Sequence, residues 1–245
     1  MVRHSLLLLC TLVSPFAWTS EGTGGSVDWP VYLGDAEGTH YSELKQINRE
    51  NVDRLVEVWR WTGSGNREDG RTQIQCNPLI IDGILYGTTA DLHVVAIDAS
   101  TGLFLWRFDP FSGEGNPSGL GVNRGLSYWI SDDGSDRRLF FSGHFFLHAL
   151  DPANGRLIES FGEGGKVDLR KGLGRPSEDL FVISNTPGAV FGELIIMPVR
   201  VGEGPGPVPP GHIRAFNVRT GEQVWRFNTI PQPGEPGYET WPPEA

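Results

Sequence analysis

Two charged residues of this 245-residue chain stand in long connections rich in glycine, where a side chain is free to meet a ligand. Arg124 lies near the end of the connection 109–125, and Glu203 lies in the Gly-Pro segment 202–211. A planar guanidinium binds a carboxylate through two parallel hydrogen bonds. A carboxylate in a flexible loop suits a hard cation that takes oxygen ligands. The alternative for both residues is an ordinary solvated loop side chain.

Other chemistries find little support in the sequence. No Cys or His cluster has metal-ligand spacing, and no glycine-rich loop precedes a helix as a phosphate site would require. The scattered histidines on or beside expected strands are His93, His144, His148 and His212. The net charge of -10 and the pI near 5.0 repel phosphate backbones and anionic membranes, so nucleic acid is excluded as a partner.

The long connections are separated in the sequence by three copies of one pattern, Ala-x-Asp/Asn-x-x-Thr/Asn-Gly-x-x-x-Trp/Phe. The copies occupy residues 94–106, 147–161 and 213–225. In each copy an apolar strand runs into an Asp or Asn, whose side chain bonds backbone groups of the turn, and a Gly four residues later reverses the chain. The spacing between Asp98, Asp151 and Asn217 is uneven, but it lies near the length of a four-stranded propeller blade.

Each copy is preceded by further strand-like sequence, so each is predicted to close a meander of about four strands. The preceding segments are 78–87, with Asp-Gly at a hairpin turn, 138–143 and 192–197. The aromatics Trp106, Phe161 and Trp225 are expected to pack between neighbouring sheets. With 33 Gly and 18 Pro, the predicted fold is all-β, a partial β-propeller of about three to four blades that cannot close a ring alone.

Two smaller elements are predicted before the first meander. Asn48 is expected to be the N-cap of a single short helix, and residues 56–61 alternate as a strand.

Residues 1–20 have the layout of a secretory signal, with Arg3 and His4 before a short apolar run and small residues near its end. A buried N-terminal strand is the alternative, and a lipoprotein at Cys10 is disfavoured by Leu9. Residues 21–27 are expected to form a linker and residues 28–245 an incomplete propeller domain. Because removal of the signal leaves Cys76 as the one cysteine, a periplasmic or otherwise exported location depends on the signal alone.

The repeat and several segments outside it resemble the quinoprotein dehydrogenases, periplasmic eight-bladed propellers that hold pyrroloquinoline quinone (PQQ) and Ca²⁺. The segments are Trp-Pro-x-Tyr-x-Gly-Asp at 29–35, Tyr41-Ser42, Gln46-Ile47-Asn48, Asn-Arg-Gly-x-x-Tyr-Trp at 123–129, 161–169 and 231–235. The resemblance covers nearly all of 28–243 and corresponds to the N-terminal half of such an enzyme. It is closest to the membrane glucose dehydrogenase branch, since the vicinal cysteines of the alcohol dehydrogenase branch are absent.

The resemblance implies four site residues. Arg124 would pair with a carboxylate of PQQ, Gln75 would face the quinone, and Glu203 would be a Ca²⁺ ligand. Asn185 stands in Asn-Thr-Pro, where the family commonly has Thr-Ser-Pro contacting the cofactor, and Pro198-Val199 replaces a Gly-Ser. A backbone donor and a hydroxyl are therefore lost from the implied site.

The implied function is an exported dehydrogenase that oxidises a sugar or alcohol by hydride transfer to the quinone and passes electrons to a respiratory-chain acceptor. The family's general-base aspartate, the other Ca²⁺ ligands and the aromatic floor would lie beyond Ala245. We therefore expect the chain alone to be inactive and to need a C-terminal half or partner chain. The alternatives are a non-catalytic propeller that binds proteins, which the same repeat also builds, and a truncated inactive homologue.

Overall fold

The structure is a computed structural model that describes residues 27–63, 73–112, 122–174, 176, 180–203 and 208–242. The predicted signal at 1–20 lies outside these residues, as does the predicted linker except for Val27. In the described residues the helices are two short 3-10 turns, η1 (Val52–Arg54) and η2 (Tyr238–Thr240). No helix in the described part is long and apolar enough to cross a membrane.

Twelve of the described strands form three four-stranded antiparallel sheets. Sheet 1 contains β1 (Leu79–Ile81), β2 (Ile84–Thr88), β3 (Val94–Asp98) and β4 (Phe104–Phe108). Sheet 2 contains β5 (Ser127–Ile130), β6 (Arg137–Gly143), β7 (Phe146–Leu150) and β8 (Lys166–Asp168). Sheet 3 contains β10 (Ala189–Phe191), β11 (Leu194–Met197), β13 (Ile213–Asn217) and β14 (Gln223–Phe227). A separate two-stranded ribbon pairs β9 (Val182–Ile183) with β12 (Arg200–Val201).

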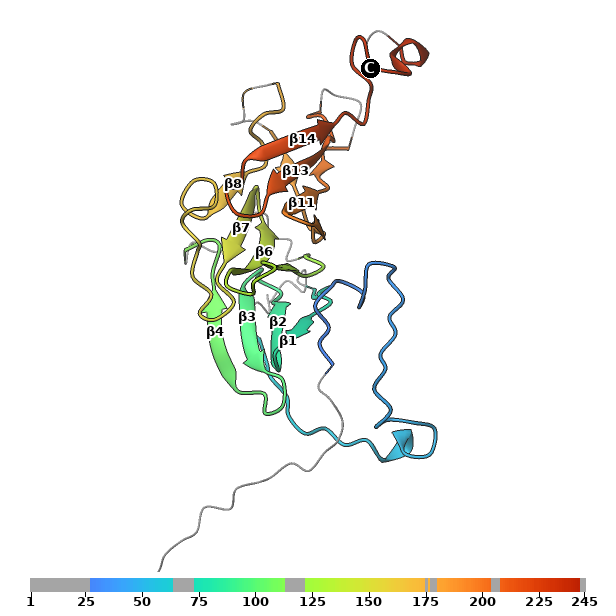
Figure 1. Cartoon of the computed structure of the whole chain (residues 1–245), viewed down its shortest axis with the longest axis vertical. Helices are drawn as coiled ribbons and strands as arrows, with labels where there is room; N and C mark the ends of the chain where they lie inside the picture. Colours follow the sequence, from blue (N-terminus) through green and yellow to red (C-terminus); the bar gives the residue numbers. More distant parts are fainter. Residues whose placement is uncertain are drawn as a thin grey trace, which may run out of the picture.

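The sheets follow one another along the long axis of the molecule, from sheet 1 in teal and green to sheet 3 in orange and red (Figure 1). Two apolar clusters form the core. One packs sheet 1 against sheet 2, and the other packs sheet 2 against sheet 3. The predicted all-β partial propeller built from four-stranded meanders is confirmed.

Each repeat forms the predicted turn between the third and fourth strands, which we call the repeat turn: residues 98–102, 151–155 and 217–221. The Asp98 carboxylate accepts hydrogen bonds from the backbone N–H groups of Ser100, at 3.0 Å, and Thr101, at 2.8 Å. Hydrogen bonds from the Ser100 and Thr101 hydroxyls, together with these backbone bonds, lower the pKa of Asp98 to about 2. Gly102 then takes a φ of 73°, which an L side chain adopts only with strain.

An aromatic residue outside each of the first two repeat turns docks on it. The Trp106 indole N–H of sheet 1 donates to the Pro152 carbonyl at 2.9 Å, and its ring covers Gly155, where a Cβ would come within 2.4 Å of a ring atom. Trp59 meets the first turn in the same way, with its indole N–H 3.1 Å from the Ala99 carbonyl. Sheet 1 is thus joined to sheet 2, and the segment that carries Trp59 to sheet 1, by an aromatic ring on a glycine with one hydrogen bond to the residue after the aspartate.

The contact between sheets 2 and 3 differs from this pattern. Phe161 is fully buried beside Phe140, with ring centroids 5.5 Å apart, which confirms that it packs between sheets. It does not end a strand as predicted, because the chain leaves the sheet after Ile158 and returns only at β8. Three glycines at positive φ make this detour possible: Gly162, Gly164 and Gly165.

Arg138 supplies the hydrogen bond that the indole makes elsewhere. Its guanidinium donates from Nη1 to the carbonyls of Val218, at 3.1 Å, and Arg219, at 2.9 Å. The same buried guanidinium pairs with Asp136 at 2.9 Å, so its charge is compensated. The Gly162 N–H donates to the Thr220 carbonyl at 2.8 Å and completes the cover of the third turn.

Three expectations about the edges of the array are not met. The helix predicted from Asn48 is the 3-10 turn η1, and residues 56–61 form no strand, because no neighbouring strand pairs with them in the described part. Trp225 does not pack between sheets, since it is 38% exposed and no described sheet follows β14.

His148 lies at the centre of the core between sheets 1 and 2. The rings of Phe108, Phe141 and Phe146 surround its imidazole, with centroid separations of 5.4, 6.0 and 6.1 Å, and its Nδ1 is 3.3 Å from the Phe141 carbonyl oxygen. Burial, and secondarily the charge of Lys166, lower the pKa of His148 to about 4. The imidazole is therefore a neutral core residue at physiological pH.

We predict that Gly155→Ala destabilises the chain more than Gly134→Ala. Both glycines have a φ of 71°, so both substitutions carry a strain of about 1–2 kcal/mol. At Gly134 nothing lies within 4 Å of the new methyl, whereas at Gly155 it meets the Trp106 ring and adds about 1–3 kcal/mol of overpacking. Urea unfolding of both variants measures the difference, and equal losses would contradict the docking contact.

We predict a loss of stability below pH 6.5 that depends on His148. Its folded-state pKa of about 4 lies below the ordinary value of 6.5, so its contribution is complete above pH 6.5 and declines as the pH falls toward 4. The loss amounts to about 3 kcal/mol. Unfolding curves across this range should show a steeper slope in the native chain and in His40→Asn, an exposed control, than in His148→Phe, where the lowered pKa values of His144 and His212 leave a smaller slope. An equal slope in His148→Phe would assign the loss to other groups.

Candidate functional site

The first strands of the three sheets, β1, β5 and β10, begin at the same edge of the array, and we call them the innermost strands. The segments that lead into them are tied together across the sheets by backbone hydrogen bonds. The Asn77 N–H donates to the Arg124 carbonyl at 3.0 Å, and the Arg124 N–H donates to the Asn185 carbonyl at 2.9 Å. The structure thus brings two of the predicted residues, Arg124 and Asn185, into direct contact, and places Gln75 close to Asn77 in the same segment.

The backbone at Arg124 is held from both sides. The next residue, Gly125, has a φ of 130°, and a Cβ there would lie 2.6 Å from the Asn77 carbonyl oxygen. The Gly125 N–H donates to the Asn123 side-chain oxygen at 2.7 Å, and the Asn123 amide donates to the Ser142 carbonyl at 2.9 Å. This position therefore requires glycine, and the arginine that precedes it is fixed in place before any ligand binds.

The side chain of Arg124 is exposed at this edge. Its Nη1 donates to the Thr186 hydroxyl at 3.3 Å, and within the described residues no acidic side chain pairs with it. The remaining N–H groups of the planar fork are available to an anionic ligand. The geometry suits two-point recognition of a carboxylate.

The neighbours of Arg124 are polar and neutral. Gln75 is exposed and Asn185 is half-buried, so both amides can reach a ligand at this edge. Cys76 lies between Gln75 and Asn77, and its sulfur accepts the Thr88 N–H at 3.2 Å. Burial raises the pKa of the Cys76 thiol, so it stays protonated and is no nucleophile.

Two residues of this edge were not predicted from the sequence, Asn77 and Thr186. Asn77 aligns the first segment through its backbone, and Thr186 positions the guanidinium. Their position in the sequence could have indicated both residues, because Asn77 and Thr186 each stand shortly before the innermost strand of their sheet, as Arg124 does. The equivalence becomes visible only when the sheets are placed side by side.

Glu203 makes no hydrogen bond or ion pair with Arg124, Gln75 or Asn185 among the described contacts. It follows β12, its side chain is 82% exposed, and its carboxylate pairs with Arg200 at 3.4 Å. Among the described residues there is no group of three or more His, Cys, Asp or Glu side chains that could hold a metal ion. Ca²⁺ takes about six to eight oxygen ligands, so these residues do not by themselves form a calcium site.

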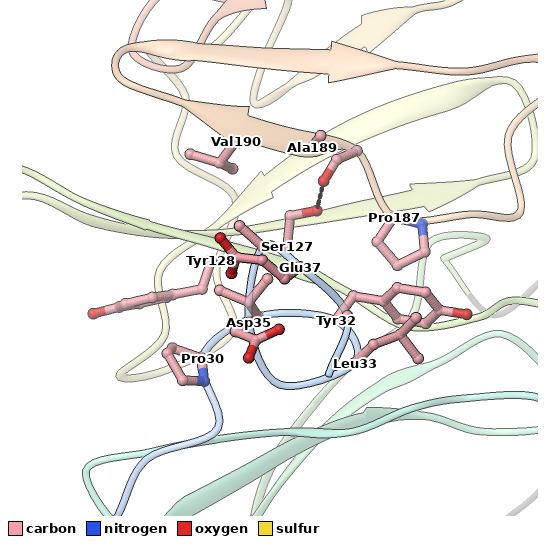
Figure 2. A pocket seen from close by; sticks show the side chains of 14 residues that line it. Pro30, Tyr32, Leu33, Asp35, Glu37, Ser127, Tyr128, Pro187, Ala189 and Val190 are labelled. Carbon is pink, nitrogen blue, oxygen red and sulfur yellow. Dashed lines mark hydrogen bonds between the residues drawn. The ribbon is translucent and has the colours of Figure 1, made fainter. Parts of the chain in front are cut away.

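A cavity of about 400 Å³ lies between the N-terminal segment 30–38 and the innermost strands β5 and β10 (Figure 2). The Ser127 hydroxyl on its wall donates to the Gly188 carbonyl, and Asp35 and Glu37 of the N-terminal segment line the same cavity. Hydrogen bonds from Thr39 lower the pKa of Asp35, which keeps it ionised. The cavity therefore disfavours an anionic ligand, which the exposed Arg124 edge favours.

Comparisons with known proteins agree with this architecture. A family model described as "PQQ: Glucose/ethanol/alcohol dehydrogenase, beta-propeller domain" matches residues 29–245. The chain is 33% identical over 233 residues to the dehydrogenase subunit of the quinone alcohol dehydrogenase of Gluconacetobacter polyoxogenes, covering 88% of this chain and 29% of that protein. It is 29% identical over 215 residues to the quinoprotein glucose dehydrogenase of Escherichia coli, covering 82% and 27%.

A solved structure gives the same result in three dimensions. The quinohemoprotein alcohol dehydrogenase of Comamonas testosteroni superposes with a TM-score of 0.66 at 27% identity, over 85% of this chain and 28% of that one. The chain thus spans less than a third of the length of the relatives that it matches.

Proposed function

Because the chain belongs to the PQQ glucose/ethanol/alcohol dehydrogenase β-propeller family, we propose that it is the N-terminal portion of an exported PQQ-dependent dehydrogenase of sugars or alcohols. In this proposal the general base and the other Ca²⁺ ligands come from the rest of the whole protein, which corresponds to the remaining length of the relatives. The respiratory-chain electron acceptor and the export route belong to the same proposal.

The observation that carries the proposal is the prearranged Arg124. Its backbone is fixed by Asn77 and Asn185, while its guanidinium faces solvent without a charged partner in the described residues. The buried Arg138, by contrast, has its charge compensated by Asp136. An exposed arginine on a rigid backbone is the arrangement expected of a residue that receives an anion.

The residues at this edge fit a planar ligand with carboxylates. Arg124 would bind one carboxylate through two hydrogen bonds, and the amides of Gln75 and Asn185 would hydrogen-bond carbonyl or carboxylate oxygens beside it. PQQ, when bound, supplies the two-electron acceptor for the oxidation of the substrate. The contribution of this chain is to bind and orient that group. Proton removal from the substrate is left to residues outside the edge.

The proposal assigns one ligand of the family's calcium ion to this chain. Glu203 is a candidate for one ligand only, and it would first have to leave Arg200. Since an exposed ion pair is worth about 0–1 kcal/mol, such an exchange is energetically easy.

We predict that Arg124→Ala weakens PQQ binding by about 10- to 100-fold, because hydrogen bonds between charged groups contribute about 1.5–3 kcal/mol. Arg124→Lys should recover part of the affinity, since an ammonium keeps the charge but loses the two-point geometry. Absorbance and fluorescence titration of the chain, and of the whole protein that contains it, with PQQ in the presence of Ca²⁺ measures the change.

Arg156→Ala is the matched control, because Arg156 is an exposed arginine that directly follows a repeat turn, outside the Arg124 edge. It should leave the affinity unchanged. If the whole protein shows no saturable PQQ binding, or if the arginine at 124 makes no difference to it, the proposal fails and a protein-binding propeller becomes the better interpretation.

A further inference from the structure

The cavity between the N-terminal segment 30–38 and the strands β5 and β10 has a lining that the proposed function leaves unused (Figure 2). Its volume of about 400 Å³ lies within the range of about 300–1,000 Å³ that small-molecule sites occupy. Most of the lining is apolar or aromatic, with Leu33 and Val190 beside the tyrosines Tyr32 and Tyr128. A small organic ligand therefore finds both the room and the apolar contact that it needs.

The charge of this lining is negative. Asp35 and Glu37 contribute carboxylates, and no Lys, Arg or His is among the described residues that line the cavity. Asp35 accepts hydrogen bonds from the backbone N–H of Thr39, at 2.8 Å, and from its hydroxyl. In the part of the chain that the structure describes, neither carboxylate forms an ion pair. A cation in the cavity would thus meet two carboxylates whose charge no basic side chain compensates.

The wall that carries the carboxylates is held in place by the chain itself. The backbone of Trp29 pairs with Ile80 of β1, with N–O distances of 2.7 and 3.1 Å. The Trp29 ring covers Gly34, where a Cβ would come within 2.7 Å of a ring atom. The neighbouring Leu33 has a φ of 66°, a left-handed conformation that is strained for a residue with a Cβ. The cavity is therefore formed before a ligand enters, which reduces the entropic cost of binding.

Other classes of ligand fit this lining less well. A metal ion would need more ligands, because the described residues contain no group of three or more His, Cys, Asp or Glu side chains that could hold one. An anion would be repelled, and a neutral molecule would leave the two carboxylates unused. An ammonium group can pair with a carboxylate while the faces of nearby tyrosine rings attract its charge.

We propose that this cavity binds a small organic cation, an ammonium group attached to a compact apolar body. Asp35 and Glu37 pair with the ammonium group, and the rings of Tyr32 and Tyr128 contact the charge and the apolar body. The proposal does not depend on PQQ binding, because none of these four residues is assigned to the Arg124 edge.

Three compounds of similar shape test the role of charge: cyclohexylammonium, cyclohexanol and cyclohexanecarboxylate. Each is titrated into the chain at neutral pH and its binding is followed by ligand-observed NMR. We expect saturable binding of the ammonium, binding of the alcohol that is about 5-fold weaker or less, and no binding of the carboxylate.

Replacing both carboxylates, by Asp35→Asn together with Glu37→Gln, should weaken the binding of cyclohexylammonium by about 5- to 30-fold, since each exposed ion pair contributes up to about a factor of five. The matched control is Glu43→Gln together with Glu50→Gln. It removes the same two charges from exposed residues that do not line the cavity, and it should leave the affinity unchanged.

The aromatic contact is tested at Tyr32. Tyr32→Phe should keep the affinity for cyclohexylammonium, whereas Tyr32→Leu should lower it by about 2- to 5-fold, because only a ring face attracts the cation. Three results would overturn the proposal: the ammonium shows no saturable binding, the alcohol binds as well as the ammonium, or the two double variants lose equal affinity. Displacement of the ammonium by Ca²⁺ at constant ionic strength would also overturn it, since the carboxylates would then belong to a metal site.

Discussion

A hydrogen bond to one carbonyl, that of the residue after the Asp or Asn of each repeat, joins each sheet to whatever precedes it. Ala99 and Pro152 accept it from the indoles of Trp59 and Trp106, and Val218 accepts it from the guanidinium of Arg138. The carbonyl is kept out of the strand ladder by the turn, so it needs an external donor. In all three cases the donor comes from the element that precedes the sheet. This contact therefore helps to set the spacing of the sheets, and that spacing brings the segments around Arg124 together.

The repeating part of the fold was predictable from the sequence because it depends on short-range chemistry. The oxygen of Asp98 bonds two backbone N–H groups of its own turn, and Gly102 provides the left-handed backbone that the turn needs. The predictions that were wrong concern elements whose structure depends on an adjacent strand or sheet. Residues 56–61 have strand-like alternation but no strand beside them in the described part, and Trp225 has no described sheet to pack against.

The candidate site was predictable in part. The resemblance implies Arg124 and Asn185, and the structure places their backbones in contact, although they precede strands of different sheets and lie far apart in the sequence. Glu203, which the resemblance implies as a metal ligand, pairs with Arg200, and its role stays a prediction. The role of Arg138 could not be foreseen, because a charged residue on a strand normally faces solvent and here replaces an indole in the core.

The cross-sheet bonds from Asn77 to Arg124 and from Arg124 to Asn185 have a thermodynamic consequence. A ligand that needs all three segments binds only the arrangement in which the three sheets keep their spacing. By mass action it must then stabilise that arrangement, by about 2.7 kcal/mol when its free concentration is about a hundred times its dissociation constant. Occupancy of the edge and cohesion of the array are linked functions, so each can be read from a measurement of the other.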